Sequence, residues 1–307
     1  MTPTGIDLEG VMIPTTTPFD PSTGELDLGG FARNLERWSR SGVRGFVVGG
    51  STGESVLLDE DERECAWEVA RDVAPPEKLV VAGVGAESRR ATLRMAARAA
   101  AAGADAVLVQ PPAYYRGAMT PEVLREHYQA VAGGSPLPVI IYQVPTRLST
   151  IELPAGLVGE LSSHERIVGV KESRSSLGAV AELVERVQPG FQILVGSGAH
   201  FFAALEIGAL GGILGVANVA PCECVQLHEH FRAGRMAEAG ALQRRVGALH
   251  RVLVVELGVA GIKHALDLLG HVGGAPRPPL RPLAAKGRER VAAALEAAGL
   301  TDGCPRS

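Results

Sequence analysis

The stretch IVGVKES at residues 167–173 is an apolar run of the kind that forms a buried β-strand, and it delivers one lysine, Lys171, to the strand end. Basic residues elsewhere are nearly all arginine, and the other lysines are Lys78, Lys263 and Lys286. An amine loses its proton when it is desolvated, whereas a guanidinium never comes near neutrality. We therefore predict that Lys171 is a Schiff-base nucleophile. A strand-end lysine can equally extend into solvent, so the rest of the chain must decide.

A short β-type run, a loop and an alanine- and arginine-rich helical pattern repeat eight times from residue 11 onward. The predicted strands are residues 11–16, 43–48, 78–84, 104–109, 138–142, 166–171, 191–195 and 211–216. The predicted helices between them include residues 31–41, 60–73, 89–102, 121–132 and 177–187. Apolar runs joined by helices are typical of a parallel sheet buried on both faces. Eight such cycles favour a (β/α)₈ barrel over an open doubly wound sheet, which usually has fewer strands.

Longer helical patterns follow the eighth strand. They cover residues 222–232, 236–256 and 262–269, and a last one ends near residue 300 after the proline-rich segment 273–283. We predict that residues 1–220 form the barrel that carries the active site. Residues 221–307 are predicted to form a C-terminal helical region that packs on the barrel or its neighbours.

Composition limits the possible partners. The chain has 307 residues, 46% of them hydrophobic, and a net charge of −4. Arginines scattered among acids give no basic tract for nucleic acid and no amphipathic anchor for a membrane, so we expect a small-molecule partner. The first ten residues resemble neither a signal peptide nor a transit peptide, and we expect a cytoplasmic protein.

Cysteine and glycine patterns give no cofactor site. The four cysteines have no framework spacing, so we expect reduced thiols at Cys65, Cys222, Cys224 and Cys304. Among the cysteines and histidines of residues 221–230, only Cys224 and His228 would share a helix face, and no metal site is predicted. The glycine-rich stretches 49–54, 83–88 and 196–201 lack the lysine or third glycine of nucleotide motifs, which leaves phosphate binding as a weak alternative.

Reactive side chains follow several of the predicted strands, and in a barrel these ends meet at one rim. The candidates are Ser51 and Thr52 after the second strand, Tyr114 and Tyr115 after the fourth, Tyr142 and Arg147 at the fifth, and Lys171 at the sixth. Each alone could shape a turn, anchor packing or carry a surface charge. Together at one rim they predict an active site.

The expected chemistry assigns a role to three of these groups. A lysine attacks a ketone only when it is deprotonated, and apolar walls from residues 167–170 would lower its pKa to about 7.5, at a cost of roughly 4 kcal/mol. Collapse of the carbinolamine needs a proton on the leaving hydroxyl, and Tyr142 is the candidate donor. The small-residue turn at residues 50–53 can hold the carboxylate of an α-keto acid through hydroxyls and backbone N–H groups.

Six motifs carry a resemblance over essentially the whole chain. They are PTTTPFD (14–20), GGSTGES (49–55), PPAYYRG (111–117), YQVPTR (142–147), GVKES (169–173) and ANVAP (217–221). In this order and spacing they resemble the dihydrodipicolinate synthase and N-acetylneuraminate lyase family, which are pyruvate-dependent class I aldolases on (β/α)₈ barrels.

The resemblance implies roles for individual residues. Lys171 would be the Schiff-base lysine and Tyr142 the proton relay, which Ser51 or Thr52 would extend to a tyrosine of a neighbouring subunit. The double tyrosine leaves open whether that residue is Tyr114 or Tyr115. The implied substrate-binding residues are Gly50, Ser51, Thr52, Arg147, Ser173, Gly196 and Ile213. The family also implies a homotetramer built from dimers, pyruvate and an aldehyde acceptor as substrates, and no metal or organic cofactor.

The resemblance is closest to the 4-hydroxy-2-oxoglutarate aldolases, through residues 44–54, 113–120, 171–173 and 258–270. Arg147, however, matches the arginine with which dihydrodipicolinate synthases hold the acceptor, and Ser51 stands where they usually have threonine. We therefore expect an aldolase acting on pyruvate and glyoxylate. The alternative is a synthase that condenses pyruvate with aspartate semialdehyde, and a sugar-acid dehydratase or aldolase comes third. The intact Lys171 and Tyr142 argue against a non-catalytic binding barrel.

Overall fold

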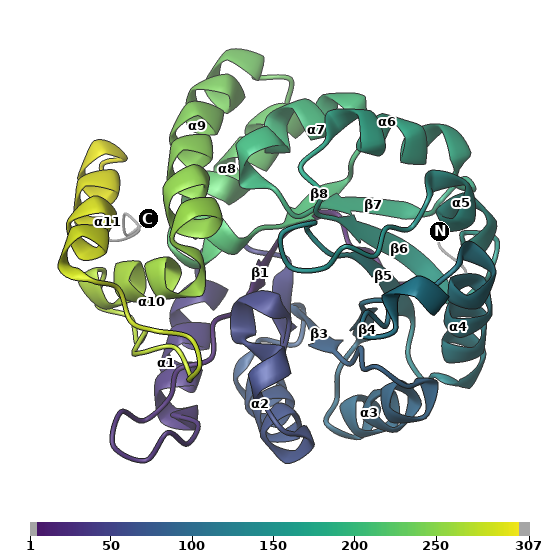
Figure 1. Ribbon diagram of the computed structural model, residues 1–307. Coiled ribbons are helices and arrows are strands. Elements are labelled where there is room, and N and C mark those ends of the chain that lie inside the picture. Colours follow the sequence, from purple (N-terminus) through teal and green to yellow (C-terminus); the bar gives the residue numbers. More distant parts are fainter. Residues whose placement is uncertain (1–4, 301–307) are drawn as a thin grey trace.

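The computed structural model describes residues 5–300, and its centre is a closed barrel of eight parallel strands (Figure 1). Each strand pairs with the next along the chain, and β8 closes the barrel on β1. The strands are β1 (Gly10–Pro14), β2 (Gly45–Val48), β3 (Leu79–Gly83), β4 (Ala106–Val109), β5 (Val139–Gln143), β6 (Ile167–Glu172), β7 (Gln192–Val195) and β8 (Gly211–Ile213). The predicted (β/α)₈ barrel is confirmed, and every predicted run overlaps a strand.

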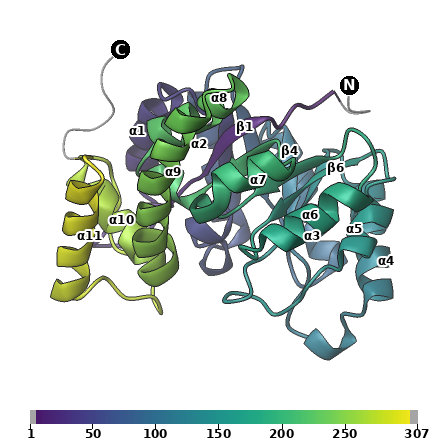
Figure 2. The same cartoon turned by 90° about the horizontal axis from the view of Figure 1, so that it is seen from above.

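Helices form an outer ring around the strands (Figures 1 and 2). They are α1 (Leu28–Ser39), α2 (Glu60–Val73), α3 (Arg89–Ala101), α4 (Pro121–Gly134), α5 (Ala155–Leu161), α6 (Leu177–Arg186), α7 (Phe201–Ile207) and α8 (Pro221–Arg232). Five of them begin after a side chain that accepts the backbone N–H three residues later: Asp27, Asp59, Ser88, Thr120 and Ser176. These caps satisfy N–H groups that have no partner within the helix.

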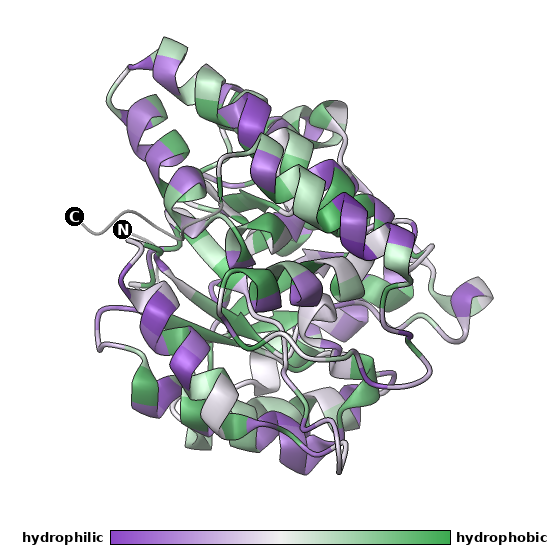
Figure 3. Ribbon diagram, turned by 90° about the vertical axis from the view of Figure 1, so that its left-hand side faces the viewer, coloured by the Kyte–Doolittle hydropathy of each residue, from purple (hydrophilic) through white to green (hydrophobic). Residues whose placement is uncertain are grey.

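Two hydrophobic cores hold the layers together. The larger core lies between the strands and the helices, and the smaller one fills the barrel interior. Most strand residues are apolar because the strands are buried on both faces, whereas the helices carry apolar and polar residues on opposite faces (Figure 3). The interior core includes Met12 and Ile213 as well as Tyr142. The barrel is therefore packed rather than hollow, and reactive groups are left to its rim.

The chain beyond β8 continues as helices on one flank of the barrel (Figure 2). They are α9 (Met236–Leu249), the π-helix η6 (His250–Glu256), α10 (Gly258–Leu268) and α11 (Ala285–Ala297). The predicted C-terminal helical extension is confirmed, but the single helix expected over residues 236–256 changes from α to π winding at His250. The π-helix and α10 pack against the turn Gly215–Asn218 after β8. The division of the chain at residue 220 stays a prediction.

The cysteines depart from expectation at one position. Cys65 and Cys224 are free thiols, but Cys222 is disulfide-bonded, so the prediction of a reduced thiol there was wrong. The four cysteines have no framework spacing, so the sequence offers no pattern from which this bond could be predicted. Cys304 lies outside the described residues. Between residues 5 and 300 there is no group of three or more His, Cys, Asp or Glu side chains that could hold a metal ion, and no helix long and apolar enough to cross a membrane.

Candidate active site

The register of two neighbouring strands places Lys171 beside Tyr142. Each is the penultimate residue of its strand, β6 or β5, and the two are paired in the sheet. The ammonium of Lys171 lies 4.3 Å from the centroid of the Tyr142 ring. Both side chains are buried, with 4% of Lys171 and 3% of Tyr142 exposed. The sequence therefore placed these two groups correctly at one rim of the barrel.

Burial alone changes the acid–base behaviour of Lys171. Desolvation lowers the pKa of its ammonium from 10.5 to about 7. At 1.36 kcal/mol for each tenfold change in acidity, this corresponds to about 5 kcal/mol of disfavour toward the charged form. At pH 7, Lys171 is therefore a neutral amine in a large fraction of the protein molecules. The neutral amine is the form that attacks a carbonyl carbon.

Tyr142 provides the neighbouring proton. Burial raises the pKa of its phenol, and a hydrogen bond with Ser51 and the charge of Arg147 partly offset that rise. The Ser51 Oγ lies 3.3 Å from the Tyr142 hydroxyl. The phenol therefore stays protonated at neutral pH, beside an amine that is partly deprotonated. This pairing suits proton transfer during imine formation.

A tight turn after β2 brings Ser51 and Thr52 to the rim. It is a short 3₁₀ segment, Ser51–Gly53, that starts at Gly50, and the Gly53 N–H donates to the Gly50 carbonyl at 3.0 Å. The first N–H groups of a helical turn have no partner within it. Together with two hydroxyls they can bind a carboxylate.

Ser173 and Gly196 lie close together at the ends of β6 and β7. A Cβ atom at residue 196 would overlap the Ser173 Oγ, so glycine is required there. The Ser173 hydroxyl lies near enough to Tyr142 to help lower its pKa, yet it is buried and has no well-formed hydrogen bond to another residue of the described chain. A buried hydroxyl without a partner costs about 1–3 kcal/mol. A bound substrate can supply the missing partner.

The remaining predicted binding residue on a strand is Ile213, at the end of β8. It is fully buried and belongs to the interior core together with Tyr142. Its side chain thus helps form the apolar floor beneath the rim. That floor keeps water away from the amine of Lys171, which is the cause of its lowered pKa.

Arg147 lies in the loop after β5, above the same rim. Its Nη2 is 3.4 Å from the Val254 carbonyl, and its charge lowers the pKa of both Tyr142 and His250. His250 was missed by the sequence analysis. Its Nδ1 accepts the Gly198 N–H at 3.2 Å, and burial lowers its pKa to about 4, so it is neutral at pH 7. His250 thereby holds the loop after β7.

The structure does not bring the two candidate relay tyrosines to Ser51. Tyr114 is 80% exposed and Tyr115 is 73% exposed, and their rings contact each other edge to face at 5.2 Å. The Glu87 carboxylate anchors their loop by accepting the Tyr114 N–H at 2.9 Å. Within residues 5–300, neither tyrosine hydroxyl hydrogen-bonds to Ser51 or Thr52. Two large aromatic side chains are thus presented to solvent at the rim.

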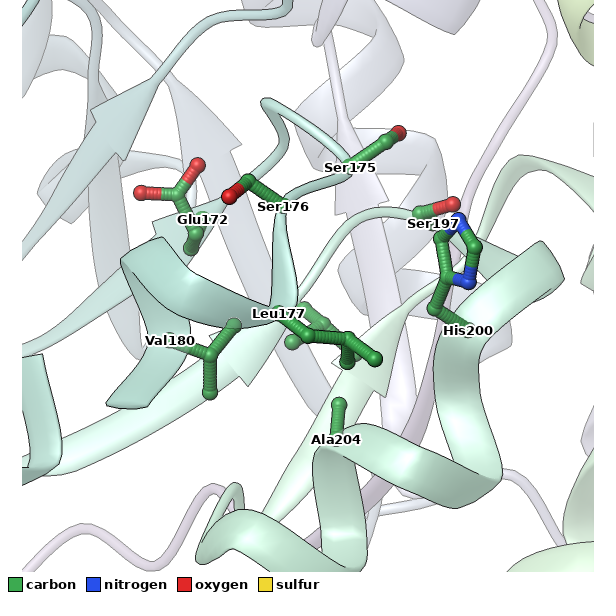
Figure 4. A pocket seen from close by; sticks show the side chains of 9 residues that line it. Glu172, Ser175, Ser176, Leu177, Val180, Ser197, His200 and Ala204 are labelled. Carbon is green, nitrogen blue, oxygen red and sulfur yellow. The ribbon is translucent and has the colours of Figure 1, made fainter. Parts of the chain in front are cut away.

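A small cleft lies next to this site but outside the barrel (Figure 4). Ser197 and His200 lie on one side of it, and Glu172 and Ser176 on the other. Successive strand residues face opposite ways, so Glu172 points away from the interior that Lys171 faces. The free volume is about 10 Å³, which is room for about one water molecule. This cleft is too small for a keto acid.

Comparison with known proteins agrees with the fold and the motifs. Residues 7–298 match the model of the Dihydrodipicolinate synthetase family. The chain belongs to this family.

Relatives within the dihydrodipicolinate synthetase family have two different names. A probable mitochondrial 4-hydroxy-2-oxoglutarate aldolase from Emericella nidulans is 36% identical over 94% of this chain and 93% of its own. A 4-hydroxy-tetrahydrodipicolinate synthase from Gluconacetobacter diazotrophicus is 35% identical over 95% of this chain and 97% of its own. At such similar identities, the comparisons show a family aldolase of the class I lyase type without separating the two activities.

Solved structures of the family superpose closely. A prophage protein of the dihydrodipicolinic acid synthase family from E. coli K12, in complex with pyruvate, matches with a TM-score of 0.91 and 28% identity over 96% of this chain and 100% of its own. Dihydrodipicolinate synthase from Aquifex aeolicus matches with a TM-score of 0.90 and 29% identity over 95% of this chain and 99% of its own.

Proposed function

We propose that the chain forms an imine between Lys171 and pyruvate and joins the resulting enamine to an aldehyde, or runs that reaction in reverse. The observation that carries the proposal is the buried amine of Lys171, whose pKa lies about 7, next to the protonated phenol of Tyr142. A related structure that contains pyruvate supports the choice of keto acid. The chemistry runs on side chains alone and requires no metal or organic cofactor.

The proposed steps use one proton shuttle. The neutral Lys171 amine attacks C2 of pyruvate, and Tyr142 gives its proton to the leaving hydroxyl, so that water departs and the imine forms. The Tyr142 phenolate then takes a proton from C3, which converts the imine into the enamine. C3 attacks the aldehyde carbon, Tyr142 protonates the new alkoxide, and water releases the product from Lys171.

Binding roles follow from the positions of the rim residues. In this proposal the turn of Gly50, Ser51 and Thr52 holds the carboxylate of pyruvate. Ser173 and Gly196 line the space beside Tyr142, where the unpartnered Ser173 hydroxyl can reach the oxygen of the acceptor. Ile213 contributes the apolar floor.

For the acceptor we propose glyoxylate, which makes the chain a 4-hydroxy-2-oxoglutarate aldolase. The relative from Emericella nidulans and the serine at position 173, directly after Lys171 and Glu172, support this choice. Arg147 favours the alternative, a 4-hydroxy-tetrahydrodipicolinate synthase acting on aspartate semialdehyde, because it matches the arginine with which dihydrodipicolinate synthases hold the carboxylate of the acceptor. A sugar-acid dehydratase or aldolase is the third candidate.

A panel of acceptors tests this assignment. The purified chain is incubated with pyruvate and with glyoxylate, aspartate semialdehyde or a sugar aldehyde, and product formation is followed for each. We expect the highest kcat/KM for glyoxylate. A higher value for aspartate semialdehyde identifies the synthase, and turnover of none of them with intact imine formation contradicts both assignments.

We also propose that a neighbouring subunit completes the relay within a homotetramer built from dimers. The support is the exposure of Tyr114 and Tyr115 beside a rim where Ser51 has only Tyr142 as a hydroxyl partner in the described chain. The cytoplasmic location stays a prediction.

Arg147→Ala is expected to weaken acceptor use and to leave the reaction with pyruvate intact. Its planar guanidinium can hold a carboxylate at two points, and losing such a charge-assisted pair costs on the order of 2–3 kcal/mol. The kcat/KM for the preferred acceptor should therefore fall roughly 30- to 150-fold.

The matched control for this prediction is Arg166→Ala. Arg166 directly precedes β6, at the opposite end of the barrel, and its guanidinium donates to the Pro136 carbonyl. This variant should form the imine with pyruvate and use the acceptor as wild type does. Loss of imine formation in Arg147→Ala, with acceptor kinetics unchanged, would show that the two carboxylate sites are assigned the wrong way round.

The pH dependence follows from Lys171. Only the neutral amine attacks pyruvate, so kcat/KM for pyruvate should rise about tenfold per pH unit below pH 7 and level off above it. Because the pKa is 10.5 in the unfolded chain and about 7 in the folded one, the unfolded chain binds more protons between these values. The free energy of unfolding of the wild-type chain, measured relative to Lys171→Met, should therefore rise as the pH is raised from about 7 to 10.5. A flat kcat/KM from pH 5.5 to 8.5 contradicts this account.

A further inference from the structure

A fully buried ion pair joins the turn after β2 to the C-terminal helices. The Lys263 ammonium lies 2.7 Å from the Glu54 carboxylate across 209 residues of sequence, and both side chains are 0% exposed. The ammonium also donates to the Ala275 carbonyl at 2.9 Å and lies 4.4 Å from the centroid of the Phe19 ring. Neither residue is part of the chemistry proposed above.

Glu54 is coupled directly to Ser51. It ends the turn Ser51–Gly53 in a left-handed conformation with φ of 59°, which costs a non-glycine residue about 1–2 kcal/mol. Its backbone N–H donates to the Ser51 carbonyl at 3.2 Å. Because the Ser51 hydroxyl contacts Tyr142 at 3.3 Å, a displacement of Glu54 moves a partner of the Tyr142 hydroxyl.

The segment after α10 closes over the same turn. The second oxygen of the Glu54 carboxylate accepts the Arg277 backbone N–H at 2.7 Å. The Arg277 guanidinium binds both oxygens of Glu62 at 2.6 Å and donates to the Leu57 carbonyl at 2.9 Å. Every oxygen of the Glu54 carboxylate is thus fixed from the C-terminal part of the chain.

Stability is a poor explanation for this pair. Burying two charges costs several kcal/mol for each ion, and well-packed apolar residues of similar volume often stabilise a fold as well or better. What a buried pair provides and apolar residues do not is a fixed geometry with directed bonds. Here the fixed group is the strained residue next to Ser51 and Thr52.

We propose that Glu54 and Lys263 are positioning residues that hold Ser51 against the Tyr142 hydroxyl and Thr52 at the proposed carboxylate site. The inference rests on the proposed function for its effect on turnover, but not for its effect on geometry. The C-terminal helices then hold the residues of the proton relay in position, although no side chain of these helices takes part in the proposed reaction.

The first test is a double-mutant cycle. Glu54→Gln keeps the shape of the side chain but removes the charge, and a displacement of about 1 Å in a catalytic group can cost about 100-fold. We expect kcat at saturating pyruvate to fall about 10- to 100-fold in an otherwise wild-type chain. In a Ser51→Ala chain the same change should cost less than about 3-fold, because it acts through Ser51. If the losses of kcat caused by Glu54→Gln and by Ser51→Ala multiply fully in the double variant, the two residues act independently and the proposal is overturned.

The control for a general loss of stability is Asp105→Asn. Its carboxylate accepts the Val80 N–H and binds Arg71 at the opposite end of the barrel. This variant should melt earlier than wild type while keeping kcat within about twofold. A loss of kcat as large as that of Glu54→Gln would mean that destabilisation alone explains both.

A neutral pair covers the case in which the single variant fails to fold. Glu54→Gln with Lys263→Met removes both charges together and is expected to fold, yet to show the same loss of kcat. A folded double variant with full kcat overturns the proposal. So does a double variant that does not fold, because the pair then maintains the fold rather than the turn.

A crystal structure of the neutral pair separates this inference from the proposed function. The distance between the Ser51 Oγ and the Tyr142 hydroxyl is expected to lengthen from 3.3 Å to beyond about 4 Å, whatever the substrate is. A distance that stays at 3.3 Å overturns the inference. Failure of the wild-type chain to bind pyruvate covalently would instead overturn the proposed function and leave this distance as the measure of positioning.

Discussion

Lys171→Met is expected to show no measurable turnover of pyruvate and yet to unfold at the same temperature as wild type or higher. Methionine keeps the length of the aliphatic stem and removes an amine that is 4% exposed and whose charged form is disfavoured by about 5 kcal/mol. Activity and stability should thus change in opposite directions, as they do where a fold carries a costly functional group. Thermal unfolding at pH 7 and steady-state kinetics measure the two effects.

Lys78→Met is the matched control for this prediction. Lys78 directly precedes β3, at the opposite end of the barrel, where its ammonium donates to the Val43 carbonyl at 2.7 Å. Its loss should leave turnover within about twofold of wild type. Residual activity in Lys171→Met comparable to that of Lys78→Met would remove Lys171 from the mechanism.

Tyr142→Phe is expected to keep the fold and to slow turnover by roughly 10²-fold or more, the usual scale for assistance by a general acid–base group. The change removes only the hydroxyl that contacts Ser51. Tyr128→Phe is the control, because it removes a buried tyrosine hydroxyl that donates to the Val109 carbonyl in the outer core. It should lower stability by about 1–3 kcal/mol without slowing turnover.

Stopped-flow or steady-state assays of the two tyrosine variants decide between relay and packing. If Tyr142→Phe melts like wild type and keeps full activity, then Tyr142 is a packing residue and the proton comes from another group. If both variants lose activity to the same extent, the effect belongs to stability and not to the relay.

The barrel was predictable because its strands are buried on both faces and so read as continuous apolar runs. Repetition of these runs with intervening helices determined the fold class without any long-range information. Short elements were harder to delimit, since α5 and α7 have only seven residues each. The change to π winding at His250 was not foreseen, because the apolar run that contains it reads as a continuation of α9.

The rim was predictable in part, because a rule about strand ends converts sequence positions into neighbours in space. That rule placed Lys171 and Tyr142 side by side, and the structure adds the contact of Tyr142 with Ser51. His250 was missed because it lies in an apolar helical run and reaches the rim only through the packing of the C-terminal helices.

The Glu54–Lys263 pair was missed for a related reason. Its partners are 209 residues apart, and nothing in the local pattern of either segment indicates that an acid and a base meet in the interior. Tyr114 and Tyr115 are the opposite case. Their motif was evident in the sequence, but both side chains are exposed in the structure, so their partner in the proposed relay has to be found by experiment.

The central claim is the covalent bond between Lys171 and pyruvate, and reductive trapping tests it most directly. Sodium borohydride added with pyruvate should attach one reduced pyruvate per chain, and peptide mass spectrometry should locate it on Lys171. The other described lysines differ in setting, since Lys263 is paired with Glu54 and Lys286 is exposed. Lys171→Met should gain no mass. An unchanged mass in the wild-type chain, or a label that persists in Lys171→Met, contradicts the account.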